Sequence, residues 1–449
     1  MRQNQETHWY LGDTTSLCEV CLTLVPAKII SEDNSVFFLK QCIQHGLQKT
    51  LISTDLEYYR WCSNFIEPTV LPHSFQTKFE KGCPFDCGLC HEHEQHSCMA
   101  ILEIIDDCNM HCPTCIAGSF PGAGNAKTLN EIEMMLDTVV ESEGYPDLLM
   151  ISGGEPTIHP QFFEVLKRVK QRPIKHVMLI TNGKLIAEDD SFVGKLAEFK
   201  DNFEVYLQFD SLRPEVLLNI RGEDVRDMRL RALHNLESAG ISTTLICVVK
   251  KGLNDDELGQ IIEFALGYSC VRGVTFQPVK VTGRNETFDK DVHYITLSET
   301  RARILEGFPR FQREDMRPHP CNPENICIGY LVREKDGRVT PVTELLLEGQ
   351  SGSSMNASVE FPGAAKLKTM LYFQPGLDTP FYNYKNLFRI TIVSFLDKFN
   401  FSITSARRSC IHFVTASKQI IPLDTYYLFY ADRQISLPLT VLKGRGEKK

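Results

Sequence analysis

The 449-residue sequence predicts an α/β protein built around a partial, TIM-like (β/α)6 barrel. A small Cys-rich metal ribbon is expected before the barrel, and an α+β cluster-binding domain after it. Strand-like and helix-like segments alternate between residues 99 and 284, cysteines gather at metal-ligand spacings, and the alternation stops after residue 285. Repeated β–α units favour a parallel sheet, which is why a barrel is expected.

The composition is that of a globular protein, with 43% hydrophobic and 23% charged residues. A net charge of −9 argues against a nucleic-acid partner. Residues 1–6 contain no apolar signal segment, and no run of about 18 apolar residues occurs. The 16 cysteines are grouped at ligand spacings, which indicates metal centres rather than disulfides. We therefore expect a cytoplasmic protein that is able to make peripheral contact with a membrane.

Residues 10–60 are expected to form the metal ribbon. Cys18 and Cys21 form one C-x-x-C knuckle, and Cys42 and His45 form a C-x-x-H knuckle. Two short strands around the turn at 32–35 would join these knuckles as a hairpin. Such a small unit needs a metal to hold it together. The ligands suit zinc and a mononuclear iron of rubredoxin type equally well.

Residues 81–98 carry a second motif, C-P-F-D-C-G-L-C followed by one more cysteine. Four thiolates close a cluster, so we expect an auxiliary 4Fe-4S centre here. Its expected ligands are Cys83, Cys87, Cys90 and Cys98. The alternative uses only the first three cysteines and leaves one iron open. The nearby histidines, His91, His93 and His96, are interpreted as loop residues rather than ligands.

Residues 99–284 form the expected barrel. Its predicted strands are 99–105, 147–152, 176–181, 204–209, 243–249 and 273–279, and its predicted helices are 129–142, 161–170, 191–199, 225–239 and 255–265. Helix starts carry plausible caps, such as Thr128. Ligands of such sheets bind at the carboxyl ends of the strands.

The first predicted strand is followed by C-N-M-H-C-P-T-C, with Cys108, Cys112 and Cys115 at i, i+4 and i+7. Three thiolates at this spacing can hold three irons of a 4Fe-4S cluster and leave the fourth open for chemistry. Zinc is the alternative metal. The second strand is followed by the S-G-G-E-P-T turn, which contains Gly153, Gly154 and Glu155.

These two motifs, in this order, resemble the radical S-adenosylmethionine (SAM) superfamily. The resemblance implies that the open iron binds the amino and carboxylate groups of SAM. It also implies that the G-G-E-P turn holds the SAM amine, because glycines allow close approach and a carboxylate pairs with an amine. Further polar residues at strand ends are expected to bind cofactor or substrate: Asn182, Gln208, Asp210, Arg221 and Gln277. Among them, Arg221 is expected to hold the SAM carboxylate or an anionic substrate.

Residues 285–449 are expected to form the C-terminal domain. Cys321, Cys327 and Cys410 are predicted to bind a third cluster, completed by His412 or an exogenous group. The Gly- and Ser-rich stretch 349–363 is predicted to be a flexible linker. Aromatic residues in this domain are candidates to line an apolar tunnel: Phe388, Phe395, Phe399 and Phe401.

The full series of blocks resembles the family that contains tetraether lipid synthase, whose members are also described as 7,8-dihydro-6-hydroxymethylpterin methyltransferases. The blocks are C-x-x-C…C-x-x-H-G, C-P-x-D-C-G-L-C, C-N-x-x-C-P-x-C, S-G-G-E-P-T, Q-F-D, R-G-E-D, T-G-R and C-I-H. The family tends to carry two adjacent cysteines in the last block. This chain has Ser409 and Cys410 there.

The resemblance implies an enzyme that reductively cleaves SAM to a 5′-deoxyadenosyl radical, which attacks an unactivated C–H bond. Carbon–carbon coupling of lipid chains is the leading expectation. The alternatives are radical methylation of a pterin or similar heterocycle, and a non-catalytic iron–sulfur electron-transfer or scaffold protein. The implied cofactors are SAM, two or three 4Fe-4S clusters and one mononuclear iron or zinc. An external electron donor such as ferredoxin or flavodoxin is the expected partner.

Overall fold

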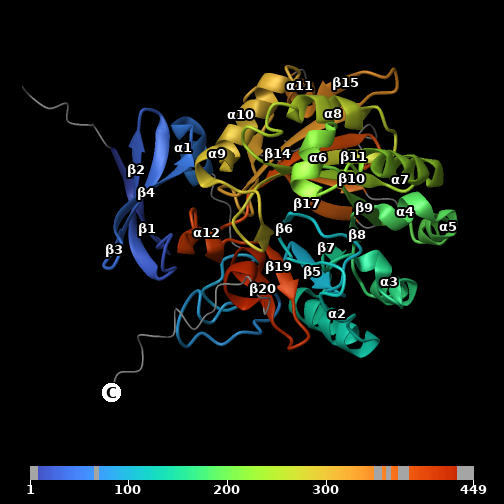
Figure 1. Ribbon diagram of the computed structural model, residues 1–449, viewed down its shortest axis with the longest axis horizontal. Coiled ribbons are helices and arrows are strands. Elements are labelled where there is room, and N and C mark those ends of the chain that lie inside the picture. The colour runs from blue at the N-terminus through green and yellow to red at the C-terminus, as the bar shows by residue number, and fades with distance from the viewer. Residues whose placement is uncertain (1–8, 65–69, 348–355, 361–365, 373–383, 432–449) are drawn as a thin grey trace, which may run out of the picture.

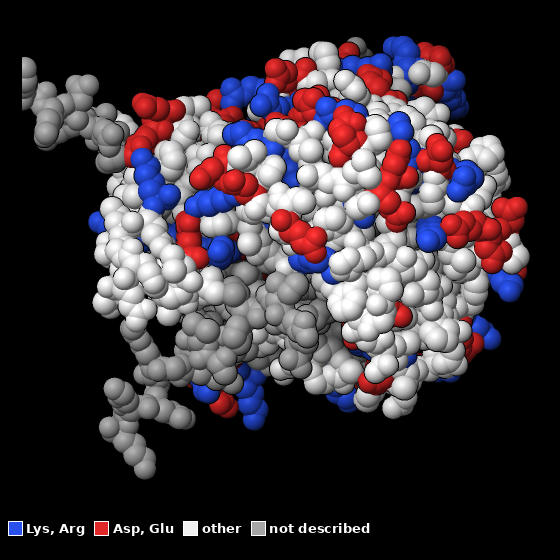
Figure 2. Space-filling model, viewed as in Figure 1, with Lys and Arg blue, Asp and Glu red and all other residues white. Residues whose placement is uncertain are grey.

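The computed structural model describes residues 9–64, 70–347, 356–360, 366–372 and 384–431. A large sheet with helices on its outer side forms most of the protein, and the N-terminal ribbon lies beside it (Figure 1). None of the helices in the described part of the chain combines the length and apolar character needed for a membrane span. On the face shown in Figure 2, acidic and basic side chains are intermingled.

Six parallel strands form the centre of the large sheet, which confirms the predicted barrel. They are β5 (Met99–Glu103), β7 (Leu148–Ser152), β8 (His176–Thr181), β9 (Phe203–Gln208), β10 (Thr243–Val249) and β11 (Val271–Pro278). They are neighbours in this same order. All six strands therefore end at the same mouth of the barrel, which is where the polar motifs begin.

Helices connect these strands and cover the outer face of the sheet (Figure 1). They are α2 (Leu129–Glu143), α3 (Phe162–Lys170), α4 (Lys184–Glu188), α5 (Asp190–Ala197), α6 (Pro214–Arg221), α7 (Arg226–Ala239) and α8 (Leu258–Leu266). Helix α2 begins with the predicted cap, because the Thr128 hydroxyl accepts from the Glu131 N–H and the Glu131 carboxylate accepts from the Thr128 N–H.

Strand residues alternate between the two faces of the sheet. Leu102 and Ile151 pack into the core shared with the outer helices, whereas Ile101, Met150 and Met178 belong to a separate cluster on the inner face. Side chains of a strand point alternately to opposite faces, so an apolar run fills both sides of a barrel wall. The inner face is consequently apolar.

The C-terminal region adds strands to both edges of the same sheet. β18 (Leu387–Val393) pairs in parallel with β11, and β19 (Ile411–Val414) pairs in parallel with β5. Further elements are β13 (Arg317–Pro318), β14 (Ile326–Arg333), β15 (Val339–Pro341), β20 (Ile420–Pro422), α9 (Lys290–His293), α10 (Leu297–Gly307), α11 (Val342–Leu347), α12 (Ile403–Arg407) and α13 (Leu423–Thr425). Residues after 285 therefore share the sheet of the barrel, and the domain boundaries expected from the sequence stay a prediction.

The predicted linker at 349–363 lies mostly outside the described residues. Its residues 356–360 form β16 (Asn356–Glu360), which pairs with β17 (Lys366–Tyr372). Of the four predicted tunnel phenylalanines, Phe395 lines a cavity, whereas Phe388 and Phe401 are fully buried in core clusters. Phe399 contacts the ring of Tyr294.

The ribbon is a four-stranded antiparallel sheet of β1 (Trp9–Leu17), β2 (Leu24–Glu32), β3 (Ser35–Cys42) and β4 (Gly46–Ser53), followed by α1 (Leu56–Asn64). Asp33 and Asn34 join β2 to β3 with φ of 43° and 69°. Two left-handed residues in succession are the geometry of a tight hairpin turn. An ion pair of 2.6 Å between Lys290 and Glu19 links the ribbon to α9.

Candidate active site

Cys108, Cys112 and Cys115 lie on the loop after β5, here called the cluster loop. The three cysteines pack in one group with Met110 and Leu217 at the barrel mouth. Burial raises the pKa of Cys108 to about 12. A metal must therefore displace the thiol proton to bind there, as soft metals do.

Two strand pairs and an arginine hold the cluster loop. β6 (Thr114–Cys115) pairs with β12 (Arg284–Asn285), and Arg284 donates from Nε to the Cys112 carbonyl at 2.7 Å and from Nη2 to the Ser119 carbonyl at 2.8 Å. Gly283 has φ of 64°, and a Cβ there would lie 2.2 Å from the Ile116 carbonyl oxygen. Arg284 belongs to the T-G-R block of the sequence, and its role in holding the cluster loop was not expected from that motif.

The Gly153–Gly154 turn is built against the start of the cluster loop. Gly154 N–H donates to the Ile105 carbonyl at 2.8 Å, and Glu155 N–H donates to the Asp107 carbonyl at 2.9 Å. A Cβ at Gly154 would lie 2.1 Å from the Asp107 carbonyl oxygen. Only glycine allows this approach of two backbones, so the turn fixes the cluster loop.

The Glu155 carboxylate points into the protein rather than toward the cavity. It accepts from Thr157 N–H at 3.1 Å, from the hydroxyls of Thr157 and Thr181 at 2.6 and 2.7 Å, and from Asn182 N–H at 2.8 Å. Its side chain is 1% exposed. The expectation that this carboxylate meets the SAM amine is not supported by this geometry, because the group is already surrounded by donors. Gly153 and Gly154 of the turn, rather than this carboxylate, line the cavity at the barrel mouth.

The other predicted strand-end residues divide into two groups. Gln208, Arg221 and Gln277 line a cavity of about 140 Å³ at the barrel mouth, together with Cys115, Gly153 and Gly154. We call it the mouth cavity. Asn182 and Asp210 do not line it. Asn182 donates to the Asn109 side chain at 2.7 Å, and Asp210 pairs with Arg221.

A second cavity continues from the mouth cavity into the barrel. It has a volume of about 270 Å³ and shares Ser152, Gln277 and Tyr427 among its lining residues with the mouth cavity. We call it the barrel cavity. The inner-face residues Met150 and Met178 form part of its walls. Its far end is lined by Cys98, Cys321 and Cys410.

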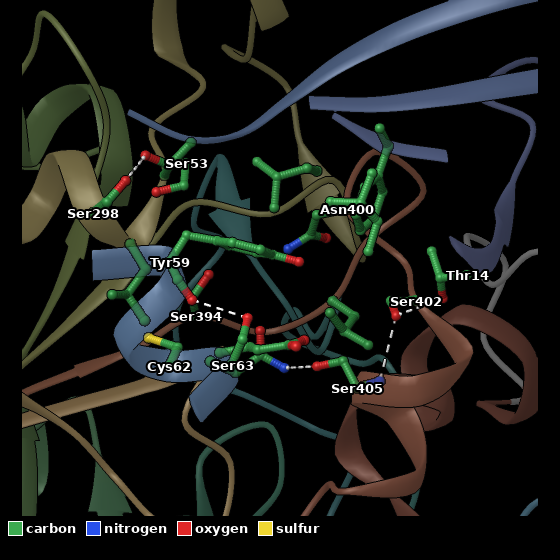
Figure 3. Close-up of a pocket in the computed structure, with 18 of the residues that line it drawn as sticks. Thr14, Ser53, Tyr59, Cys62, Ser63, Ser298, Ser394, Asn400, Ser402 and Ser405 are labelled. Atoms are coloured by element: carbon green, nitrogen blue, oxygen red, sulfur yellow. Dashed lines mark hydrogen bonds between the residues drawn. The ribbon is translucent and has the colours of Figure 1, made fainter. Parts of the chain in front are cut away.

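A third cavity, of about 240 Å³, lies between the ribbon, α1 and the C-terminal segment (Figure 3). Hydroxyl groups dominate its lining, including those of Tyr59, Ser394 and Ser402, and the Thr14 and Ser402 hydroxyls lie 2.9 Å apart. Lys280 lines both this cavity and the mouth cavity. Unlike the barrel cavity, it is suited to water or a polar molecule.

The ribbon brings its four predicted ligands together. One ligand atom from each of Cys18, Cys21, Cys42 and His45 lies within 4.8 Å of the others. His45 Nδ1 is 3.5 Å from both Cys18 Sγ and Cys42 Sγ, and Cys21 Sγ is 3.8 Å from Cys42 Sγ. For metal–sulfur bonds of 2.3 Å a tetrahedral site needs sulfurs about 3.8 Å apart, so the arrangement fits one metal ion.

The structure regroups the other predicted cluster ligands. Cys98 does not join Cys83, Cys87 and Cys90, which interact electrostatically with one another. Instead its Sγ lies 3.0 Å from Cys321 Sγ, and Cys410 completes this group. The reason is strand pairing, because Met99 and Ile411 are partners in β5 and β19, which places the residues before them side by side.

Cys327 does not join Cys321 and Cys410, contrary to the expected third set. Its neighbour Ile326 packs against those two cysteines, so Cys327 on the same strand faces the opposite side. There it interacts with Tyr58 and Arg301. Alternation along β14 therefore excludes Cys327 from this group.

Comparisons with known proteins agree with this site. Residues 102–265 match the model of the radical SAM superfamily, and residues 10–54 match the HMPTM N-terminal zinc ribbon domain. The chain carries a radical SAM domain. It is therefore an enzyme whose domain binds SAM and a 4Fe-4S cluster, and the thiols of the cluster loop and the close Gly153–Gly154 turn fit these groups.

Two curated relatives show how far this similarity extends. The 7,8-dihydro-6-hydroxymethylpterin dimethyltransferase of Methanocaldococcus jannaschii is 26% identical over 492 residues, which cover 95% of this chain and 96% of the relative. The GTP 3′,8-cyclase of Shewanella denitrificans is 28% identical, covering 49% of this chain and 64% of the relative. A crystal structure of Streptococcus suis SuiB bound to S-adenosylmethionine is 19% identical, with a TM-score of 0.38, covering 44% of this chain and 45% of that one.

Proposed function

We propose that this protein is a radical SAM methyltransferase whose acceptor is a small, flat heterocycle of the pterin class. The relative from M. jannaschii, which is named for such an activity, aligns with almost the whole chain. The observation that carries the proposal is the barrel cavity of about 270 Å³, which opens beside the cluster loop. Small-molecule sites are typically enclosed and mostly apolar, with few polar groups.

The walls of the barrel cavity suit a flat ring. The side chains of Tyr206, Phe413 and Tyr427 offer aromatic surface, and Gln277 and Thr275 offer hydrogen-bonding groups for a polar edge. Aliphatic side chains line most of the rest of the barrel cavity and exclude water, which protects a reactive radical from side reactions. Coupling of lipid chains, which was the leading expectation from the sequence, becomes the second candidate function.

Residues at the mouth have separate roles in this proposal. Cys108, Cys112 and Cys115 would hold a 4Fe-4S cluster, which together with SAM would supply the radical chemistry that activates a C–H bond of the substrate. Arg284 and the Gly153–Gly154 turn fix the cluster loop in position. Gln208 and Gln277 face the mouth cavity, where they orient SAM or the substrate.

The remaining cysteine sets are proposed as metal centres. Cys83, Cys87 and Cys90 would hold an auxiliary 4Fe-4S cluster with one iron open, since Cys98 is placed elsewhere. The ribbon would hold a single zinc, in line with its family model. A low-potential donor such as ferredoxin or flavodoxin would supply electrons.

Methyl transfer is tested by anaerobic incubation of the reconstituted enzyme with reduced flavodoxin, methyl-13C-labelled SAM and a panel of reduced pterins. We expect labelled product together with 5′-deoxyadenosine and S-adenosylhomocysteine, because one SAM yields the radical and another donates the methyl group. The Cys108→Ala variant should give none of these. Release of 5′-deoxyadenosine without label in any pterin would contradict the proposal.

Coupling of lipid chains remains the second candidate because one wall of the barrel cavity is aliphatic. Ile101, Met150, Met178, Ile326 and Ile328 all line it. The same assay with long-chain lipids in detergent separates the two functions. Coupling removes one hydrogen from each chain, so the product loses two hydrogens. It consumes two SAM as methionine and 5′-deoxyadenosine, and it produces no S-adenosylhomocysteine or methyl label.

A further inference from the structure

Three thiols from distant parts of the chain meet at the far end of the barrel cavity. One ligand atom from each of Cys98, Cys321 and Cys410 lies within 4.8 Å of the others. The chain supplies two of them directly before paired strands and the third from the loop after β13. Soft thiolates bind iron or zinc. A closed centre of either kind needs a fourth ligand.

His412, which the sequence analysis expected to complete this centre unless an exogenous group does so, is not placed to be the fourth ligand, and neither are Cys327 and Ser409. Cys327 faces the other side of β14. The Ser409 hydroxyl donates to the Ile411 carbonyl at 3.4 Å. His412 has Nε2 at 3.0 Å from His93 Nε2 and Nδ1 at 3.2 Å from the Ser97 hydroxyl, so both ring nitrogens are engaged elsewhere.

His96 approaches the thiol group from the Cys98 side. Its Nε2 lies 3.5 Å from Cys98 Sγ, and its Nδ1 lies 2.9 Å from Glu143 Oε2. Glu143, the last residue of α2, is fixed in turn because its Oε1 accepts from the Ser97 N–H at 3.1 Å. A metal-binding histidine characteristically donates its second N–H to a carboxylate, which orients the ring.

The ribbon provides an internal standard for this spacing. There His45 Nδ1 lies 3.5 Å from two cysteine sulfurs, the same separation as between His96 Nε2 and Cys98 Sγ. Bonds of about 2.0 Å to nitrogen and 2.3 Å to sulfur place tetrahedral N and S ligands about 3.5 Å apart. The His96–Cys98 separation therefore suits two ligands of one metal.

We propose that the metal centre on Cys98, Cys321 and Cys410 takes its fourth protein ligand from His96, with Glu143 as the positioning residue. Only the three thiols, and not His96, have ligand atoms that all lie within 4.8 Å of one another, so these four ligands fit the wider spacing of an iron–sulfur cluster better than a single ion. The competing ligand is His319, which lines the barrel cavity and whose buried Nδ1 has no hydrogen-bond partner within the described part of the chain.

Metal analysis of the full chain tests the thiol group. Cys321→Ala should lose the centre, whereas Cys327→Ala, a matched buried cysteine six residues away, should keep it. Loss of about four irons with sulfide identifies a cluster, and loss of one ion without sulfide identifies a single metal. Loss in both variants or in neither would overturn the grouping.

Ligation by the histidine is tested by the hyperfine coupling of its nitrogen to the unpaired electron of the metal centre. All variants are made in His45→Cys protein, which lacks the histidine of the ribbon, and are labelled with 15N-histidine and measured without SAM. Pulsed EPR of the reduced protein should show a strongly coupled 15N that disappears in His96→Ala and persists in His319→Ala. If the metal is zinc, cobalt(II) replaces it for the same measurement. Loss of the coupling in His319→Ala, or its persistence in both variants, would overturn the proposal.

Two further variants separate ligation from folding. His96→Cys should keep the metal, because a thiolate replaces the imidazole, but should lose the 15N coupling. Glu143→Gln should weaken metal affinity by about 10–100-fold and shift the coupling, since the ring loses its carboxylate. An unchanged coupling in Glu143→Gln would show that Glu143 is only structural.

Discussion

Arg221 and Asp210 form a buried, two-pronged ion pair beside the cluster loop. Arg221 Nε lies 2.7 Å from Asp210 Oδ2, and Nη2 lies 2.8 Å from Oδ1. Arg229 adds a second ion pair at 2.9 Å, and Arg221 also forms a side-chain hydrogen bond with Cys112. Arg221 therefore joins the end of β9 to the cluster loop. Its guanidinium already has a carboxylate partner within the protein.

Asp210→Asn should destabilise the protein in a pH-dependent way. Burial opposes ionisation of Asp210, but Arg221 and Arg229 outweigh it and lower the pKa to about 2. A folded-state pKa below the ordinary value of about 3.9 stabilises the protein above about pH 5, and this contribution is lost as the pH falls toward 2. The shift of about 2 units corresponds to about 2.6 kcal/mol, and the two unpaired guanidiniums add to the loss.

Anaerobic urea unfolding at pH 7 and pH 3.5 measures this effect. The difference between wild type and Asp210→Asn should be smaller at pH 3.5. Asp256→Asn is the control, because Asp256 pairs with Arg213 at the surface and is 66% exposed. Its effect should stay below about 0.5 kcal/mol. An equal difference for Asp210→Asn at both pH values would show that the ion pair does not stabilise the fold.

Gly154→Ala should disrupt the site without a general loss of folding. The added Cβ would meet backbone atoms of Asp106 and Asp107, which cannot move away as a side chain would. We expect 5′-deoxyadenosine formation to fall on the order of 100-fold, because displacement of the reacting groups by about 1 Å has that effect. Gly194→Ala is the control, since a Cβ there meets nothing within 4 Å. Equal activity of the two variants would contradict the role of the turn.

Substitution of any cysteine in the cluster loop should abolish SAM cleavage. Cys112→Ala should lose the reductive release of 5′-deoxyadenosine and about four irons per chain. Cys247→Ala is the matched control, because Cys247 is fully buried inside β10 and belongs to the apolar core. That variant should lose some stability but keep its iron. Retained cleavage in Cys112→Ala would rule out the predicted cluster.

The ribbon should fold only with its metal. Four ligands surround one site in a unit of about 45 residues, and units of this size depend on a metal or disulfide. Cys42→Ala should lose one zinc per chain and become sensitive to proteolysis within residues 10–54. Cys270→Ser, which changes a buried cysteine of the barrel, should retain both zinc and resistance. Full protease resistance of a zinc-free ribbon would contradict this dependence.

Local sequence determined much of this protein. Hydrophobic segments of strand and helix length located the six β–α units, because each unit is built from short-range patterns. The cluster loop and ribbon were visible because their ligands are close in sequence. Glu155 was a different case, because its residue type suggested contact with a ligand, whereas two of its four donors come from Thr181 and Asn182, which only the fold brings near it.

What only the tertiary structure decided is which distant residues meet. Cys98 belongs with Cys321 and Cys410 because β19 pairs with β5, and strand pairing over 300 residues leaves no local pattern. The direction of Cys327 depends on which face of β14 covers the barrel core, and the partner of Arg221 depends on the turn after β9. Sequence fixes spacings along the chain, but the geometry of a metal centre or cavity depends on separations in space, which packing sets.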